Sequence, residues 1–354
     1  MKSLHIATVL ATESAEAIAG AGIGVKNWRM AMVTAGHRVD LITHPEAQSA
    51  SQNARLAISS MLVQRWSIER PDVVHLELAS NVAFAAKSAA KQLEIPVVSG
   101  FHHLHMYAAP GTESRVLKTL AQFHNGCAIT VAEQHSSLPL MAMLGITEAT
   151  VINRGVDTNK FNQCWRNNEV RASWGANYDT PVILQVGRII PTKDPEGFIQ
   201  ACRLARQRNP AVVIVIVGDG SELQTMRNAL PWATFTGELS GHDLSIVYAS
   251  SDIFVLSSPD EPWGNVLMEA ASSGLAIVAR SGGAMTDILA PASACVLPIP
   301  NNRNELAESV AALATDQERI VNLKLHARQS ACEQSWSKTV VAWENLLHNN
   351  LKCI

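Results

Sequence analysis

Short apolar runs alternate with longer segments of mixed polarity along the whole chain. The runs are rich in Val, Ile, Leu and Ala, which is typical of strands buried on both faces of a parallel sheet. Between them, apolar residues recur at three- and four-residue intervals, the spacing of an amphipathic helix. This alternation predicts an α/β fold built on parallel sheets. Strands are predicted at residues 4–10, 38–43, 71–75, 95–99, 128–131, 182–186, 212–217, 235–237, 252–258 and 275–279.

The predicted strands fall into two groups, and the first group opens with a strand, a loop, a helix and a second strand, as a Rossmann-like domain does. A chain of 354 residues is long enough for two such domains. The expected boundaries are an N-terminal domain at 1–160, a second domain at 161–335 and a C-terminal helical segment at 336–354. A glycine-rich stretch at 20–24 is expected to form a loop.

Composition narrows the class of protein. Hydrophobic residues make up 47% of the chain and charged residues 17%, so a large core is expected and disorder is not. The net charge of −3 argues against a dedicated nucleic-acid binder. No stretch approaches the ~18 uncharged apolar residues of a membrane span. Basic and acidic residues are nearly balanced within 1–160, so at most peripheral membrane contact is expected.

The six cysteines are scattered along the chain without a CxxC pair. This pattern predicts reduced thiols in a protein of the cytoplasm. Any peripheral membrane contact would place it at the inner face of the membrane.

The stretch at 251–283 carries the strongest chemical signal. It predicts a strand, a turn, a helix at 265–272 that ends at Gly274, and a second strand. Glu261 follows the carboxyl end of the first strand, and Glu269 lies eight residues further on, inside the helix. Ligands of open parallel sheets bind at this edge. Helix-start amides near Gly264–Val266 suit a phosphate, and the carboxylates suit hydroxyl groups, although acids beside a helix start also occur simply as solvated caps.

Two cations follow the predicted strand at 182–186. Arg188 and Lys193 lie on the loop at the carboxyl edge of the second sheet, where they would neutralise a leaving pyrophosphate. The alternative is a pair of solvated loop cations.

Other signals argue against cofactors. His102, His103 and His105 follow the strand at 95–99, but a zinc site usually needs a further ligand at helical or hairpin spacing, and the sequence offers no firm candidate. The segment GAGIG departs from GxGxxG and lies well past the first strand, which argues against a dinucleotide fingerprint. No metal and no cofactor are therefore expected.

The setting DEPWGNVLMEAASSGLAIVA, with its two glutamates eight residues apart, resembles the donor-binding signature of the retaining glycosyltransferases of family 4. Further segments resemble the same family: PDVVH at 71–75, RGVDTNKF at 154–161, VGR followed by Lys193, and VGDG at 217–220. Thr192 stands where the family has an acid. The resemblance covers nearly the whole chain and implies the GT-B fold, two Rossmann-like doubly wound domains facing each other across a cleft. It also implies that the final helix packs back on the first domain.

The resemblance implies a role for each candidate residue. Arg188 and Lys193 would stabilise the diphosphate, Glu261 would bind donor-sugar hydroxyls, and Glu269 would bind the ribose. His102 would contact the sugar, and FHxxxxxY, ending at Tyr107, resembles the branch of GDP-mannose-dependent mannosyltransferases and sulfoquinovosyldiacylglycerol synthase. Backbone contacts to the ligand are implied at Gly22 or Gly24, Gly187, Gly218, Gly237, Gly264, Asn265 and Val266.

The sequence therefore predicts a retaining, metal-independent hexosyltransferase. It would move a mannose- or glucose-type hexose from a GDP-sugar or UDP-sugar to a glycolipid or cell-envelope polysaccharide. Two alternatives stay open: a nucleotide-sugar 2-epimerase on the same scaffold, and a non-catalytic nucleotide-sugar-binding subunit. The epimerase would want extra acids in the cleft, and a non-catalytic subunit would be expected to have lost some of the four charged candidates.

Overall fold

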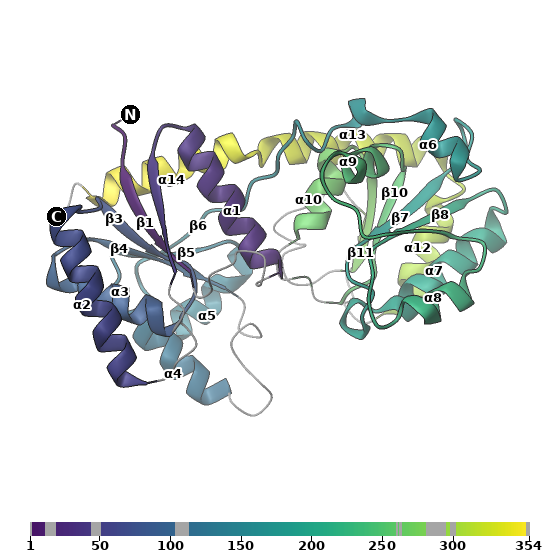
Figure 1. Cartoon of the computed structure of the whole chain (residues 1–354). Coiled ribbons are helices and arrows are strands. Elements are labelled where there is room, and N and C mark those ends of the chain that lie inside the picture. The colour runs from purple at the N-terminus through teal and green to yellow at the C-terminus, as the bar shows by residue number, and fades with distance from the viewer. Residues whose placement is uncertain are drawn as a thin grey trace. The chain divides into compact units, whose positions relative to one another are not determined.

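A computed structural model describes residues 2–10, 19–43, 51–102, 113–259, 261, 264–280, 295–297 and 302–351. The chain divides into two compact units (Figure 1). The first consists of Met1–Gly155 together with Trp336–Ile354, and the second of Val156–Ser335. Among the described residues, no helix is long and apolar enough to cross a membrane.

The first unit is a six-stranded parallel sheet covered by helices on both faces. Its elements are β1 (His5–Val9), α1 (Ala19–Thr34), β2 (Arg38–Ile42), α2 (Gln52–Ile68), β3 (Val73–Leu76), α3 (Asn81–Gln92), β4 (Val97–Phe101), α4 (Glu113–His124), β5 (Ile129–Ala132), α5 (Leu138–Met143), β6 (Ala149–Val151) and α14 (Trp336–Leu351). The strand order is β2-β1-β3-β4-β5-β6. Val73 packs against α1 and α14, whereas its neighbour Val74 packs against α2 and α3, so each strand serves two cores.

The second unit has the same construction. Its elements are α6 (Asn168–Ser173), β7 (Val182–Val186), α7 (Pro195–Arg208), β8 (Val213–Val217), α8 (Leu223–Ala229), β9 (Thr234–Gly237), α9 (Gly241–Ala249), β10 (Ile253–Leu256), α10 (Asn265–Ser272), β11 (Ala276–Arg280), β12 (Cys295–Leu297), α12 (Arg303–Leu313) and α13 (Gln317–Glu333). The strand order, β12-β11-β10-β7-β8-β9, is that of a Rossmann sheet. Ile183 packs against α7 and α12, and Leu184 against α9, α10 and α13. The predicted α/β class with two Rossmann-like sheets is confirmed.

A single buried carboxylate ties the second unit together. Asp252, just before β10, bonds Arg171 of α6 at 2.8 Å, Lys324 of α13 at 2.9 Å and Arg166 at 3.1 Å. Burial opposes its ionisation, but the three cations together hold the pKa of Asp252 below its usual range. The ion pairs therefore connect the first helix of this unit, its sheet and its last helix.

Three local expectations need correction. Residues 20–24 are not a loop, because α1 begins at Ala19 and includes them. The short strands β6 and β12 were not predicted. Both strands are three residues long and lie at the ends of their sheets, where an apolar run is too brief to stand out from a loop.

Candidate active site

The order of strands in the second sheet reverses between β7 and β10, which is where ligands of such sheets bind. Lys193 ends the 3₁₀ turn that follows β7, and Glu261 follows β10. Their side chains form an ion pair of 2.5 Å between Nζ and Oε2. Glu261 is buried and Lys193 is partly exposed. The structure therefore brings two of the predicted site residues into direct contact at this switch point.

The neighbouring Asp194 fixes the turn that carries Lys193. Asp194 has a left-handed backbone with φ of 51°, and its carboxylate caps α7 by accepting from the amide of Gly197. The same carboxylate bonds Arg280 at the end of β11 and Arg303 at the start of α12, each at 2.6 Å. These contacts offset the strain of the left-handed conformation and hold Lys193 in register with β10. Sequence reasoning missed Asp194, which directly follows Lys193.

Three of the candidate glycines lie directly after β7, directly after β8 and in β9, and each has a backbone reason to be glycine. Gly187, Gly218 and Gly237 all have positive φ, of 141°, 133° and 75°. The amide of Gly218 donates to the carbonyl of Gly237 at 2.8 Å. A Cβ on Gly218 would lie 2.0 Å from the carbonyl oxygen of Gly187, so the loops after β7 and β8 approach too closely for a side chain. The predicted contacts of these glycines with a ligand stay predictions.

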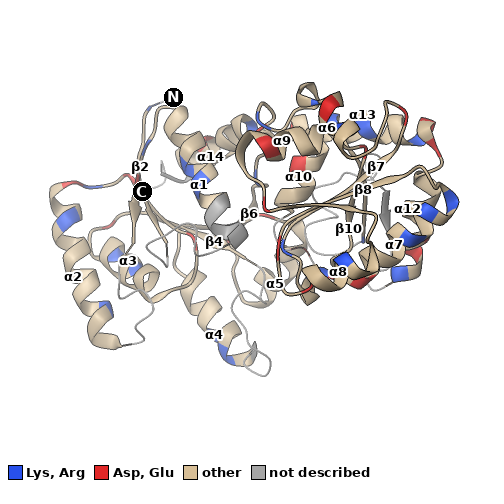
Figure 2. Ribbon diagram, turned by 45° about the vertical axis from the view of Figure 1, so that its right-hand side comes forward, with Lys and Arg blue, Asp and Glu red and all other residues tan. Residues whose placement is uncertain are grey.

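The helix α10 carries the remaining candidates of this unit. It begins after Gly264, so Asn265 and Val266 lie in its first turn. Gly264 has a left-handed φ of 60° and no side chain with which to cap the helix. Glu269 is the acidic residue of α10, coloured red in Figure 2. Burial raises the pKa of Glu269 to about 7, although the Tyr248 hydroxyl bonded to it favours ionisation. Arg188 is exposed, and no described side chain pairs with it.

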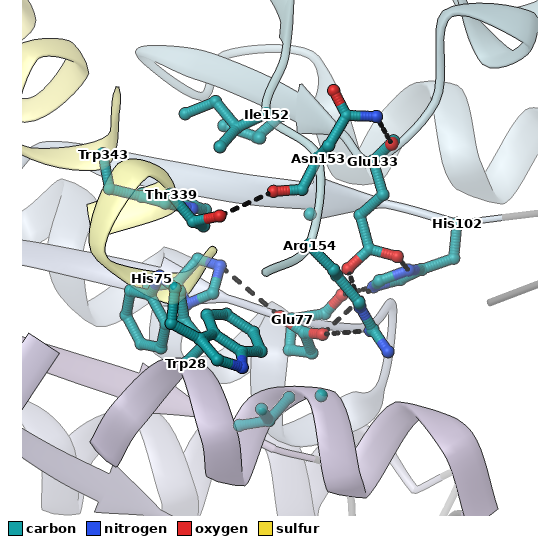
Figure 3. A pocket seen from close by; sticks show the side chains of 15 residues that line it. Trp28, His75, Glu77, His102, Glu133, Ile152, Asn153, Arg154, Thr339 and Trp343 are labelled. Atoms are coloured by element: carbon teal, nitrogen blue, oxygen red, sulfur yellow. Dashed lines mark hydrogen bonds and ion pairs between the residues drawn. The ribbon is translucent and has the colours of Figure 1, made fainter. Parts of the chain in front are cut away.

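In the first unit, four polar residues follow the carboxyl ends of four neighbouring strands (Figure 3). Glu77 follows β3, His102 follows β4, Glu133 follows β5, and Arg154 lies just beyond β6. The Nε2 atom of His102 donates to the backbone carbonyl of Glu77 at 2.7 Å, and its Nδ1 atom lies 3.9 Å from Oε2 of Glu133. This hydrogen bond fixes the ring of His102 at the edge of the sheet.

Arg154 supplies the positive charge of this cluster. Its guanidinium pairs with Glu133 and lies 3.7 Å from Oε1 of Glu77. Burial raises the pKa of Glu77 to about 8, the charge of Glu133 adds to this, and Arg154 opposes it. Ligand atoms of Glu77, His102 and Glu133 lie within 4.8 Å of one another, a spacing that suits a metal, and the guanidinium of Arg154 is already paired with Glu133 there.

The start of α1 closes over this cluster. Gly22 and Gly24 both lie inside α1. A Cβ on Gly24 would lie 2.2 Å from Cζ of Arg154, so the guanidinium packs directly on the helix backbone. The cavity beside these residues has a volume of about 30 Å³, room for a water molecule rather than a sugar. In this structure the bare face of Gly24 is therefore occupied by a side chain.

Sequence reasoning missed Glu77 and Glu133. Each acid comes directly after a buried apolar strand, at the edge where a parallel sheet binds ligands, and that position was the available signal. His103, His105 and Tyr107 lie outside the described residues.

The two Rossmann-like units match the GT-B fold of glycosyltransferases. Comparison with known proteins supports this class. The sequence pattern described as Glycosyltransferase Family 4 matches residues 18–160, and that described as Glycosyl transferases group 1 matches residues 166–330. The chain belongs to the family 4 glycosyltransferases and is a transferase.

Individual relatives agree with this placement. A GDP-mannose-dependent alpha-mannosyltransferase of Mycobacterium tuberculosis is 30% identical, over 75% of this chain and 70% of its own. Sulfoquinovosyl transferase SQD2 of Arabidopsis thaliana is 31% identical, over 66% of this chain but only 47% of its own. Among solved structures, sucrose-phosphate synthase of Thermosynechococcus elongatus has a TM-score of 0.79 at 16% identity, covering 99% of this chain and 100% of its own, which shows a shared fold.

Proposed function

We propose that the protein transfers a mannose- or glucose-type hexose from a GDP-sugar or UDP-sugar to a glycolipid or cell-envelope polysaccharide acceptor, with retention of the anomeric configuration. The observation that carries this proposal is the Lys193–Glu261 pair at the switch point of the second sheet. A cation there suits the diphosphate of a donor, and a carboxylate beside it suits the hydroxyls of the sugar that the diphosphate carries. The mannosyltransferase relative favours GDP-mannose among the donors.

Each side chain has one task in the proposed reaction. Lys193 and Arg188 stabilise the negative charge that develops on the leaving diphosphate, and the first amides of α10 hold phosphate and sugar. Glu261 accepts hydrogen bonds from the sugar, and Glu269 accepts them from the ribose.

His102, held by the carbonyl of Glu77, contacts the sugar at the reacting face. The leaving phosphate takes the proton of the acceptor hydroxyl, so no protein nucleophile is required. No metal is required because the two cations and the helix amides balance the charge of the phosphates. No nucleic acid is involved, and contact with a membrane is at most peripheral. The relatives reported above give no support to the epimerase or to the non-catalytic subunit.

A thermal-shift panel tests the donor site. The full chain would be heated with GDP, UDP, ADP or dTDP, with and without EDTA, and compared with Lys193→Ala. We expect one nucleotide to stabilise the wild type regardless of EDTA, and to stabilise the variant much less. If no nucleotide shifts the melting temperature, the assigned site is wrong.

Transfer itself is tested with the stabilising nucleotide's mannose and glucose derivatives and a lipid or oligosaccharide acceptor. The anomeric configuration of the product, read by NMR, distinguishes retention from inversion. Conversion of the donor without acceptor would favour the epimerase instead.

A further inference from the structure

A buried tyrosine is bonded to the glutamate assigned to the ribose. Tyr248 lies on α9, and its hydroxyl donates to Oε2 of Glu269 on α10 at 3.0 Å. We propose that Tyr248 is a positioning residue for the donor: its hydroxyl holds the Glu269 carboxylate ionised and oriented toward the ribose hydroxyls. This inference rests on the function proposed above, which assigns Glu269 to the ribose.

The ring of Tyr248 lies in apolar surroundings. Its ring is fully buried and packs edge-on against Phe161, with centroids 5.6 Å apart, and lies 6.0 Å from Phe254. Burying a hydroxyl in such surroundings costs about 1–3 kcal/mol unless it is hydrogen-bonded. Among the described residues the hydroxyl bonds Glu269. The polar atom of this otherwise apolar side chain is thus directed at one carboxylate.

Charge explains why that hydrogen bond matters. Burial raises the pKa of Glu269 to about 7, while the hydrogen bond from Tyr248 and the charge of Lys160 lower it. Burial also raises the pKa of the Tyr248 phenol well above its usual range, so the hydroxyl stays a donor throughout the neutral range. Glu269 therefore titrates near neutral pH, and loss of one hydrogen bond to its ionised form would leave it mostly protonated.

The ionised form is the one that fits a ribose. A carboxylate accepts on both oxygens, and the bond from Tyr248 uses one lone pair of Oε2, leaving Oε1 for the neighbouring hydroxyls of the sugar. Hydrogen bonds to a charged acceptor are about twice as strong as neutral ones. A protonated Glu269 would turn one of its acceptors into a donor and bind the ribose less tightly.

The test is Tyr248→Phe in the full chain, which removes one oxygen and keeps the ring. Tyr178→Phe, at a tyrosine that is 75% exposed, is the matched control. The affinity for GDP or UDP, whichever stabilises the wild type, is measured by calorimetry from pH 6 to 9. Titration of the nucleotide's own phosphate cancels in the ratio of variant to wild type.

We expect Tyr248→Phe to bind about fivefold more weakly at pH 7, because a rise of one pKa unit lowers the ionised fraction from about one half to about one eleventh. The ratio should return to about 1 by pH 9, where both proteins are ionised. With the 2′,3′-dideoxy nucleotide, which lacks the ribose hydroxyls, the ratio should be about 1 at every pH. The Tyr178→Phe control should match the wild type throughout.

Two results would overturn the inference: an unchanged affinity, or a loss that is the same at every pH and for both nucleotides. If Tyr248→Phe does not fold, Lys160→Gln replaces it, since removing this exposed charge should shift the profile in the same direction. Glu269→Gln separates the two levels of the argument. Weak binding by Glu269→Gln with normal binding by Tyr248→Phe refutes the inference alone, whereas normal binding by Glu269→Gln refutes the proposed ribose site as well.

Discussion

Replacing Gly24 by alanine should destabilise the first unit, although the same change in an ordinary helix stabilises it. Gly24 lies within α1, where Gly→Ala is normally favourable by about 0.5–1 kcal/mol. Here the new Cβ would lie 2.2 Å from both Cζ and Nη1 of Arg154. Since carbon atoms in contact lie about 3.5–4.0 Å apart, the guanidinium would have to retreat by more than about 1 Å.

That retreat separates Arg154 from the carboxylate of Glu133, with which it is paired, and from Glu77, 3.7 Å away. The arginine side chain is only 10% exposed, so water cannot replace these contacts well. Weakening a hydrogen bond between charged groups costs about 1.5–3 kcal/mol, and subtracting the helix gain leaves a predicted loss of roughly 0.5–2.5 kcal/mol in the free energy of unfolding.

A double-mutant cycle tests this prediction, because the effect of Gly24→Ala on stability should change sign when Arg154 is removed. Urea unfolding, followed by tryptophan fluorescence, would compare wild type, Gly24→Ala, Arg154→Ala and the double variant. Arg154→Ala should itself be destabilising, because it leaves the buried Glu77 and the partly buried Glu133 without their cation. In that background, Gly24→Ala should stabilise by about 0.5–1 kcal/mol. If it destabilises equally in both backgrounds, the guanidinium is not what excludes a side chain at position 24, and the reasoning fails.

Three further predictions concern charge and backbone. Glu261→Gln should raise the affinity for the bare nucleoside diphosphate by roughly tenfold in calorimetry, because Glu261 no longer neutralises Lys193. Sugar transfer should fall. An unchanged affinity would count against the role assigned to this ion pair. Glu77→Gln should leave diphosphate affinity unchanged. Burial raises the pKa of Glu77 to about 8, above its value in the unfolded chain. The contribution of Glu77 to the stability of the wild type is therefore fully present below about pH 4.5 and is lost as the pH rises through 8. Melting temperatures should therefore show Glu77→Gln gaining on the wild type between those limits, and a constant difference would contradict the assignment. In urea titrations, Gly218→Ala should lower the free energy of unfolding by at least ~3 kcal/mol, whereas Gly237→Ala should lower it by about 1 kcal/mol. Both positions have a positive φ, but only at Gly218 does the new side chain also clash with the backbone. Equal losses would mean that the backbone moves aside at little cost.

The pattern of apolar runs was enough to predict both sheets apart from their short end strands, β6 and β12. Strands such as Val182–Val186 stood out because parallel strands buried on two faces are apolar throughout. The start of α1 was predicted wrongly, because several closely spaced glycines are intrinsically poor helix formers. Gly24 lies against Arg154, 130 positions away in the chain, and no local pattern contains that contact.

The sequence predicted those site residues whose signals lie within a short stretch of the chain, and missed those that depend on which strands are neighbours. Lys193 and Glu261 each follow an apolar run, so the sequence placed both at one sheet edge, but their pairing depends on β7 and β10 being neighbours. Glu77 and Glu133 carry no motif. They form a cluster only because β3, β4 and β5 lie side by side, an adjacency that the order of residues does not state.

The way the chain joins its two units has a consequence for how the protein is made. The second unit is one uninterrupted segment whose ends meet, since Val156 forms a parallel bridge with Ser335. The first unit instead needs α14, whose Trp343 packs against Trp28 with ring centroids 5.2 Å apart. During synthesis, the second unit is therefore complete before the first unit, which still lacks α14. Until α14 leaves the ribosome, the apolar side chains of α1 that it covers stay exposed as a transient apolar surface of the nascent chain.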